Sequence, residues 1–179
     1  TGNLGKPASG LNPLMSDANS QGAIDMGCVP SQNGLTHQEM MEGARTKIIR
    51  SMFVSGDINF NDILVDQRSL GMLDFLVVQT LFHNDVTEVA DVVLPVASVA
   101  EIDGTFTNAE RRVQRVNKVI EPIADVKAGW QIVCDLASKM GVEGFDFSGP
   151  DQIMEEISSQ VPTYGGIRYS RLGVNGLQW

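Results

Sequence analysis

The chain has 179 residues, of which 42% are hydrophobic and 20% charged, and its formal net charge is −9 at neutral pH. This length fits one domain, or one domain with part of another, and the hydrophobic share is sufficient for a buried core. The acidic balance argues against nucleic acid as the main partner, because binding to phosphates favours a basic surface.

Cysteine content and hydropathy limit the class of protein further. The only cysteines, Cys28 and Cys134, lie far apart and form no CxxC pair, so these residues encode neither an iron–sulfur cluster nor a structural zinc site. No apolar run approaches the ~20 residues needed to span a bilayer, and we expect a cytoplasmic location. The chain starts at Thr1 without an initiator methionine, and we expect it to be a fragment of a longer protein.

The first third of the chain passes from loop to regular structure. Residues 1–35 read as loop because Gly and Pro recur at short intervals, with a short helical turn expected within 20–27. A Thr-x-x-Glu capping box at Thr36 then predicts a helix that ends near Thr46. The apolar run after it predicts a buried strand over 48–54.

The middle of the chain alternates helical and apolar segments. A helix capped by Asn59 or Asn61 comes first, followed by a second buried strand over 75–78. A short helix over 84–89 leads to a third strand over 91–94. Apolar strands that alternate with helices indicate a parallel sheet with right-handed crossovers. The sequence therefore predicts an α/β fold built on a parallel-sheet, Rossmann-like dinucleotide-binding domain.

The last part of the chain is expected to be mostly helical support. The segment after Pro95 is polar and predicts a loop. A helix is predicted over 126–140, with Gly141 in the usual place of a C-terminal glycine. Pro150 suits the first turn of another short helix, and residues 165–179 read as a linker.

Open α/β folds bind ligands at the carboxyl ends of their strands, so the loops after the three predicted strands are candidate sites. The first holds Gly56 and Asp57, the second holds Gln79 and Thr80, and the third begins after Pro95. Gly56 lets the backbone come close to a ligand, while the next carboxylate and amide can accept hydrogen bonds from a ribose or a guanine edge. The alternative is that these residues only end strands and cap helices.

Other polar residues leave their roles open. His37 is expected at the surface, and His83 is either a ligand-binding residue or an ordinary loop residue. Asp103, Glu110 and Arg111 either bind a ligand or bridge one another. The sequence contains no GxGxxG or Walker motif, and no Ser-His-Asp or Cys-His arrangement is supported.

Several segments, in order, carry a resemblance to one enzyme family: TGNLGKPASGLNPL, NSQGAIDMG, LDFLVVQ, ADVVLPVAS, DGTFTNAERRVQR and YSRLGVNGLQW. Together they resemble the catalytic subunit of molybdopterin-dependent oxidoreductases, in particular the alpha subunit of formate dehydrogenase and the large iron–sulfur subunit of NADH–quinone oxidoreductase. The resemblance covers nearly the whole chain, and DGTFTNAERRVQR is its specific signal.

The resemblance implies two molybdopterin guanine dinucleotides (bis-MGD) around molybdenum or tungsten, one of them held by the loops after the strands of this chain. It agrees with Gly56, Asp57 and Gln79 as cofactor-binding residues. By position it adds further polar neighbours: Asn19, Gln21, Gly22, Asp91, Ser98, Thr107 and Asn108. Many such groups are expected, because each unpaired polar edge of a pterin or guanine costs roughly 1–3 kcal/mol.

The same resemblance implies iron–sulfur clusters in parts of the subunit outside this chain, and partner redox subunits that are NAD- or ferredoxin-linked. The chain departs from the family at several positions. Met15 stands where formate dehydrogenases have an arginine that faces the metal, and a thioether cannot pair with a carboxylate substrate. Thr80 stands where aspartate is common, residues 56–59 replace Gly-Glu-Asn-Pro, and the chain is shorter between Pro30 and Leu35.

Two functions follow as hypotheses. The first is the cofactor-binding portion of a formate dehydrogenase-like molybdopterin oxidoreductase within a multisubunit redox complex. The alternative is a non-catalytic scaffold or electron-relay subunit that has lost the metal cofactor. For the domains, we expect residues 1–35 to be a cofactor-facing part of a neighbouring domain, 36–163 to form the dinucleotide-binding domain, and 164–179 to link to a further domain.

Overall fold

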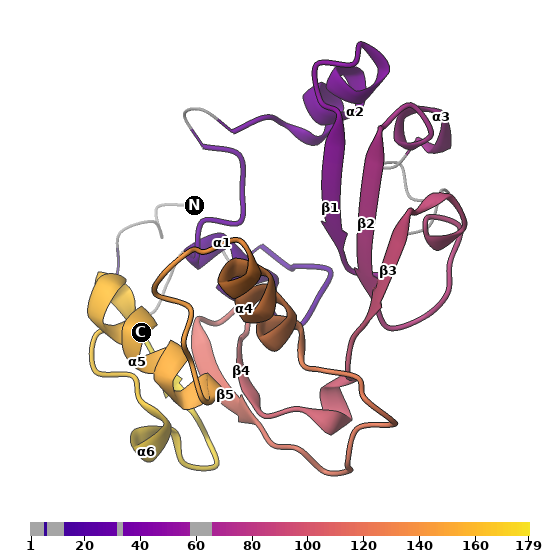
Figure 1. Ribbon diagram of the computed structural model, residues 1–179. Coiled ribbons are helices and arrows are strands. Elements are labelled where there is room, and N and C mark those ends of the chain that lie inside the picture. Colours follow the sequence, from indigo (N-terminus) through magenta and orange to yellow (C-terminus); the bar gives the residue numbers. More distant parts are fainter. Residues whose placement is uncertain (1–5, 7–12, 32–33, 58–65) are drawn as a thin grey trace. The chain divides into compact units, whose positions relative to one another are not determined.

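The computed structural model describes residues 6, 13–31, 34–57 and 66–179 (Figure 1). The chain divides into two compact units, each assembled from segments that are distant in sequence. The parallel-sheet unit comprises Pro30–Ile102 and Lys118–Asp146, and the hairpin unit comprises Thr1–Val29, Asp103–Asn117 and Phe147–Trp179. The expected domain boundaries at residues 36 and 164 concern the complete protein and stay a prediction.

Three parallel strands form the sheet of the parallel-sheet unit. They are β1 (Ser51–Ser55), β2 (Phe75–Thr80) and β3 (Val92–Pro95), in the order β1-β2-β3 (Figure 1). Each lies within a few residues of its predicted position, because a short apolar run between polar turns is a strong strand signal. The predicted α/β class with a parallel sheet is therefore confirmed.

Helices cover one face of this sheet. Strand side chains alternate between the two faces, and those of Leu76 and Val78 point into a core that contains Met41 of α2 (His37–Arg45) and Leu70 of α3 (Gln67–Leu70). Met52 and Val54 of β1 pack against the same core. The hydrophobic side of the two helices and the alternation of the strands thus produce one buried layer.

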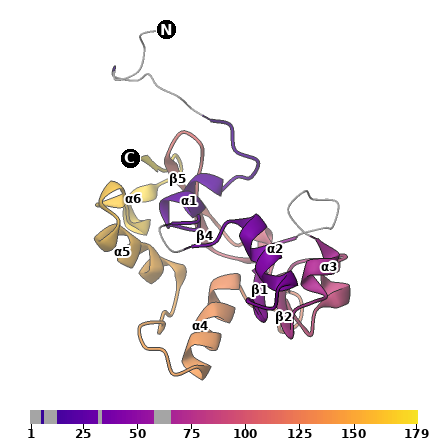
Figure 2. The same ribbon diagram turned by 90° about the horizontal axis from the view of Figure 1, so that it is seen from above.

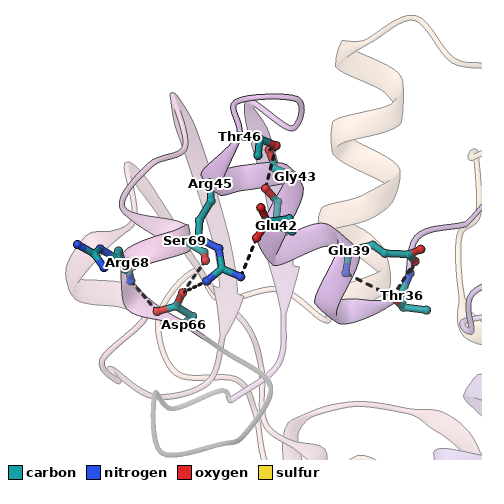
Figure 3. A network of polar contacts seen from close by, with 9 residues as sticks. All are labelled: Thr36, Glu39, Glu42, Gly43, Arg45, Thr46, Asp66, Arg68 and Ser69. Atoms are coloured by element: carbon teal, nitrogen blue, oxygen red, sulfur yellow. Dashed lines mark hydrogen bonds and ion pairs between the residues drawn. The ribbon is translucent and has the colours of Figure 1, made fainter.

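Polar contacts fix the starts of both helices and join them, as Figure 3 shows. Thr36 and Glu39 form the predicted capping box: Thr36 Oγ1 accepts from Glu39 N, and Glu39 Oε2 accepts from Thr36 N at 2.7 Å. Asp66 caps α3 and accepts a hydrogen bond from Ser69 Oγ at 2.6 Å. Arg45 lies 3.5 Å from the same carboxylate, which links the end of α2 to the start of α3.

The opposite face of the sheet is largely open to solvent. Phe53 and Val92 lie in register on either side of Val77, and Phe53, Phe75 and Val92 are 42%, 45% and 37% exposed. All-parallel sheets are normally buried on both faces. The described residues therefore leave part of an apolar sheet face without a covering layer.

The sequence predicts two helices between β1 and β3. The proposed helix over 84–89 was wrong in length and type, because only a 3-10 turn, η1 (Thr87–Val89), forms there. The Asn84 side chain accepts hydrogen bonds from Val86 N and Thr87 N, which closes a tight turn instead of starting an α-helix. The caps proposed at Asn59 and Asn61 lie outside the described residues, and Asp66 caps the helix that the structure shows.

The hairpin unit is built on antiparallel strands. β4 (Gly104–Thr107) pairs with β5 (Arg112–Val116), which pairs with the short β6 (Leu177–Gln178). The prediction of a polar loop after Pro95 was wrong for 104–116. Asn108 closes the turn, since its Oδ1 accepts from Glu110 N and Arg112 N at 3.0 Å each. One buried valine on β5 supplies the apolar side of the hairpin.

The remaining helices of this unit lie beside the β4–β5 hairpin (Figure 2). They are α1 (Ser20–Asp25), α5 (Pro150–Gln160), η3 (Pro162–Tyr164) and α6 (Tyr169–Leu172). Val113 forms a core with Met154, Tyr164, Ile167 and Leu172. The short α1 and the helix that begins at Pro150 agree with the sequence prediction.

The segment after residue 164, predicted to be a linker, contributes α6, β6 and two buried side chains to this core. Whether it leads to a further domain stays a prediction.

In the parallel-sheet unit, α4 (Gly129–Lys139) confirms the helix predicted over 126–140, although it begins three residues later, and Gly141 follows it with a φ of +72°. Among the described residues, no helix has the length and apolarity needed to cross a membrane.

The core under the sheet gives a stability prediction. Leu76→Ala should lower the free energy of unfolding by about 2–5 kcal/mol, because Leu76 is 1% exposed and its loss leaves a cavity. Leu14→Ala is a matched control, since Leu14 is 91% exposed, and should change stability by less than about 0.5 kcal/mol. Denaturant unfolding of the two variants measures both, and equal losses would contradict this core.

Candidate functional site

Parallel strands bring their carboxyl ends to one edge of the sheet, here called the carboxyl edge. Gly56 and Gln79 meet there, and Gly56 N donates to Gln79 O at 2.9 Å. Gly56 has a φ of +128°, a backbone conformation that side chains with a Cβ rarely adopt. Because this residue has no side chain, a ligand can come close to the backbone where the chain leaves β1.

Asp57 ties the loop after β1 to the loop after β2. Its Oδ1 accepts hydrogen bonds from Thr80 Oγ1 and from the backbone N–H groups of Leu81 and Phe82, the last two at 3.2 Å. The turn after β2 thus depends on this carboxylate. Its second oxygen, Oδ2, accepts no hydrogen bond from the described residues and is the atom that a ligand could engage.

Gln79 has the most unusual environment at the carboxyl edge. The residue is 5% exposed, yet its Oε1 is buried without a hydrogen-bond partner among the described residues. Buried polar atoms are nearly always paired, and an unpaired one costs about 1–3 kcal/mol. The side chain lies beside Gly129, the first residue of α4, where an added Cβ would come within 2.7 Å of Gln79 Nε2.

The other two predicted residues of this unit are placed differently. Ser98 begins η2 (Val99–Glu101), a short way beyond β3. Hydrogen bonds from the Ser98 hydroxyl and the Ser98 N–H hold the pKa of Glu101 below its usual range. Asp91 lies before β3, at the amino end of the sheet, where its Oδ2 accepts from Leu76 N at 2.7 Å. The structure does not bring Asp91 together with the carboxyl edge.

A cavity of about 320 Å³ lies beside the end of β3, and its walls are mainly apolar. It is lined by Leu94, Pro95, Asp125, Lys127, Ile132, Asp135, Leu136 and Lys139. None of the residues predicted to bind a cofactor lines it. Its charged rim is also partly neutralised, because Lys127 and Asp135 form an ion pair at 2.5 Å.

The hairpin unit brings a second set of predicted residues together. Thr107 N donates to Asn19 Oδ1 at 2.8 Å, and the Thr107 hydroxyl lies 2.9 Å from the hydroxyl of Tyr164. Tyr164 donates to Asp25 Oδ2 at 2.8 Å, and Gln21 Nε2 donates to Asp25 Oδ1 at the same distance. One hydrogen-bonded chain therefore contains three predicted residues and two, Asp25 and Tyr164, that the sequence did not single out.

Gly22 and Asn108 have structural tasks in this unit. Gly22 is buried, and a Cβ at this position would collide with Asn19 Oδ1, so glycine allows the asparagine side chain to lie across the start of α1. The Asn108 side chain is engaged in closing the β4–β5 turn. Burial raises the pKa of Tyr164 to about 12, and the hydrogen bond to Asp25 acts in the same direction.

Residues considered for other chemistry take ordinary positions. His83 Nδ1 lies 3.2 Å from Thr87 Oγ1, within the turn that precedes η1. The Asp103 carboxylate lies 3.9 Å from Arg115, and Arg111 lies over the ring of Trp179. In the part of the chain that the structure describes, no group of three or more His, Cys, Asp or Glu residues could hold a metal ion.

Comparison with known proteins gives these groups a context. Residues 1–139 match the family model described as molybdopterin oxidoreductase. The alpha subunit of F420-dependent formate dehydrogenase 1 from Methanococcus maripaludis is 39% identical over 208 positions, which cover 100% of this chain and 31% of that subunit. The F420-dependent formate dehydrogenase subunit alpha of Methanocaldococcus jannaschii is 36% identical with the same coverage.

The chain thus spans about a third of the length of these curated relatives. Among solved structures, acetylene hydratase from Pelobacter acetylenicus matches with a TM-score of 0.58 and 16% identity, over 75% of this chain and 19% of that one. At this identity the structural likeness concerns the fold alone.

The contact between Gln79 and Gly129 can be tested by adding a Cβ. Gly129→Ala should be less stable than Gly104→Ala by about 1 kcal/mol, because the new methyl group forces the end of the buried Gln79 side chain to shift. Gly104 is the matched control, since an added Cβ there meets no atom within 4 Å. Thermal or denaturant unfolding gives the difference, and two variants of equal stability would contradict the close approach.

Proposed function

The chain belongs to the molybdopterin oxidoreductase family and is a formate dehydrogenase-like subunit, and from that premise we propose that it binds a pterin–guanine dinucleotide within a multisubunit redox complex. The carboxyl edge of its parallel sheet is the proposed binding surface. The observation that carries the proposal is the buried Gln79 amide, whose oxygen has no partner among the described residues.

The residues of this edge fit such a ligand. A pterin and a guanine both present N–H donors, and an N–H donor is what Gln79 Oε1 lacks. Gly129 keeps the space beside this amide open, and the N–H groups at the start of α4 favour a phosphate. Gly56 and the outer oxygen of Asp57 complete the edge with a close backbone and a second acceptor.

In the hairpin unit, we assign Asn19, Gln21 and Thr107 as the polar residues that face the cofactor. Gln21 is held by its hydrogen bond to Asp25, the Thr107 hydroxyl by its contact with Tyr164, and Asn19 by the N–H of Thr107, so the three have fixed orientations before any ligand arrives. Such preorganisation lowers the entropic cost of binding. Ser98 and Asn108 are assigned as further cofactor neighbours, and Glu101 and the hairpin turn already engage their side chains.

When bound, the metal and its pterins supply the redox chemistry, and the protein contributes binding and orientation. Formate is the proposed substrate class because the relatives are named formate dehydrogenases. The designation "subunit alpha" supports further redox subunits as partners of this chain, and F420 becomes a candidate electron acceptor alongside the NAD- and ferredoxin-linked subunits expected from the sequence.

Two residues, Met15 and Thr80, favour the second hypothesis, a scaffold or electron-relay subunit without the metal. Met15 stands where the resemblance implies an arginine for the substrate carboxylate, and its thioether cannot donate to an anion. The two hypotheses differ in whether the complex contains the metal and the dinucleotide, so chemical analysis separates them.

The test is an analysis of the purified complex that contains this chain. We expect molybdenum or tungsten together with pterin, and release of GMP after hydrolysis, because the guanine end is part of the proposed ligand. Absence of both metal and pterin would assign the chain to the scaffold hypothesis. Pterin without GMP would contradict the dinucleotide form while leaving a pterin site in place.

Gln79→Leu should have opposite effects on stability and binding. Without cofactor, the chain should gain about 1 kcal/mol, because the variant removes a buried unpaired oxygen. In the complex, the same change should lower the amount of pterin retained, because the acceptor is lost. Gln114→Leu, at an exposed position of β5, is the matched control. If Gln79→Leu loses stability and keeps its pterin, the assigned role of Gln79 is wrong.

A further inference from the structure

We propose that Tyr164 is a positioning residue for the cofactor: through its hydroxyl, Tyr164 together with Asp25 sets which hydrogen-bonding group the Thr107 side chain presents to the ligand beside Asn19. This inference rests on the proposed function. Tyr164 belongs to η3 and Asp25 to the end of α1, so this contact joins two segments that are 139 positions apart in the sequence.

The direction of each hydrogen bond follows from Asp25, the acceptor at one end of this series of hydrogen bonds. The two oxygens of Asp25 accept from Tyr164 and Gln21, each at 2.8 Å. Because the Tyr164 proton is given to Asp25, the Tyr164 oxygen acts as the acceptor in its 2.9 Å contact with Thr107. The Thr107 hydroxyl must then donate to Tyr164, since a hydroxyl carries one proton.

This fixed direction determines what a ligand meets. With its proton committed, the Thr107 hydroxyl can only accept a hydrogen bond from a ligand N–H or O–H. The Asn19 side chain has a fixed orientation, because its Oδ1 accepts from Thr107 N at 2.8 Å. Asn19 Nδ2, which makes no hydrogen bond to a described residue, is left as the donor. The pair offers one acceptor and one donor, as the edge of a purine or pterin requires.

Burial makes this arrangement hard to reverse. Tyr164 and Thr107 are 2% and 4% exposed, so water cannot easily replace either partner. The Tyr164 ring packs in the core with Val113 and lies 6.0 Å from the ring of Trp179. Its raised pKa keeps the phenol protonated through the physiological range, so its proton remains available to Asp25.

The same unit offers a matched tyrosine without such partners. The Tyr169 hydroxyl is buried, and it has no hydrogen-bond partner among the described residues. Tyr169 instead lies under the guanidinium of Arg115 at 4.8 Å. Removing the hydroxyl of Tyr164 breaks a connected chain, whereas removing that of Tyr169 only deletes an unpaired atom.

The experiment compares Tyr164→Phe and Tyr169→Phe in the purified complex, with retained pterin per subunit after extensive dialysis as the readout. Tyr164→Phe should bind the cofactor about tenfold more weakly, since the Thr107 hydroxyl becomes free to rotate. Tyr169→Phe should retain the wild-type amount. Unfolding of both variants is measured in parallel, so that loss of pterin can be separated from loss of fold.

Asp25→Ala provides a second route if Tyr164→Phe does not assemble. It removes the acceptor for the Tyr164 proton and leaves the core ring in place, so pterin retention should fall in the same direction. Wild-type retention in either Tyr164→Phe or Asp25→Ala would overturn the inference. A wild-type complex without pterin would overturn the proposed function, and the inference with it, so the two failures are distinguishable.

Discussion

The parallel register of β1, β2 and β3 is the constraint on which the carboxyl edge depends. Since each strand runs in the same direction, the turns that follow them are brought to one edge, although they are separated by some twenty residues of sequence. Gly56 and Gln79 are neighbours there because of this pairing alone. The helices on one face hold the register by burying Leu76 and Val78, so the core and the site are consequences of the same alternation.

Local sequence signals predicted most of the parallel-sheet unit. The hairpin and the long-range contacts of the hairpin unit were missed. The capping box at Thr36 and the three apolar runs depend on neighbours in sequence, so they could be recognised directly. The hairpin over 104–116 was mistaken for a loop because its strands carry mostly polar residues and bury only one valine. The contact of Tyr164 with Asp25 joins positions 139 residues apart, and no periodicity encodes such a contact.

The residues predicted to bind the cofactor differ in whether their polar atoms already have hydrogen-bond partners within the protein. Polar residues at strand ends serve the protein first: Asp91 accepts from the backbone of β2, and Asn108 closes a turn. Residue type cannot distinguish these from a group such as Gln79, whose oxygen is left without a partner. The distinction depends on which donors lie within about 3 Å, and only a three-dimensional arrangement provides that information.

The half-exposed aromatic side chains on the open sheet face have a consequence for handling the polypeptide. Phe53 and Phe75 are exposed apolar side chains through which two copies of the chain can associate. The net charge of −9 opposes this association by electrostatic repulsion. Added salt reduces the range of this repulsion to a Debye length of roughly 10 Å or less. It does not weaken the attraction between apolar side chains. Self-association of the isolated chain should therefore increase as ionic strength rises. Low protein concentration and low salt suit its preparation.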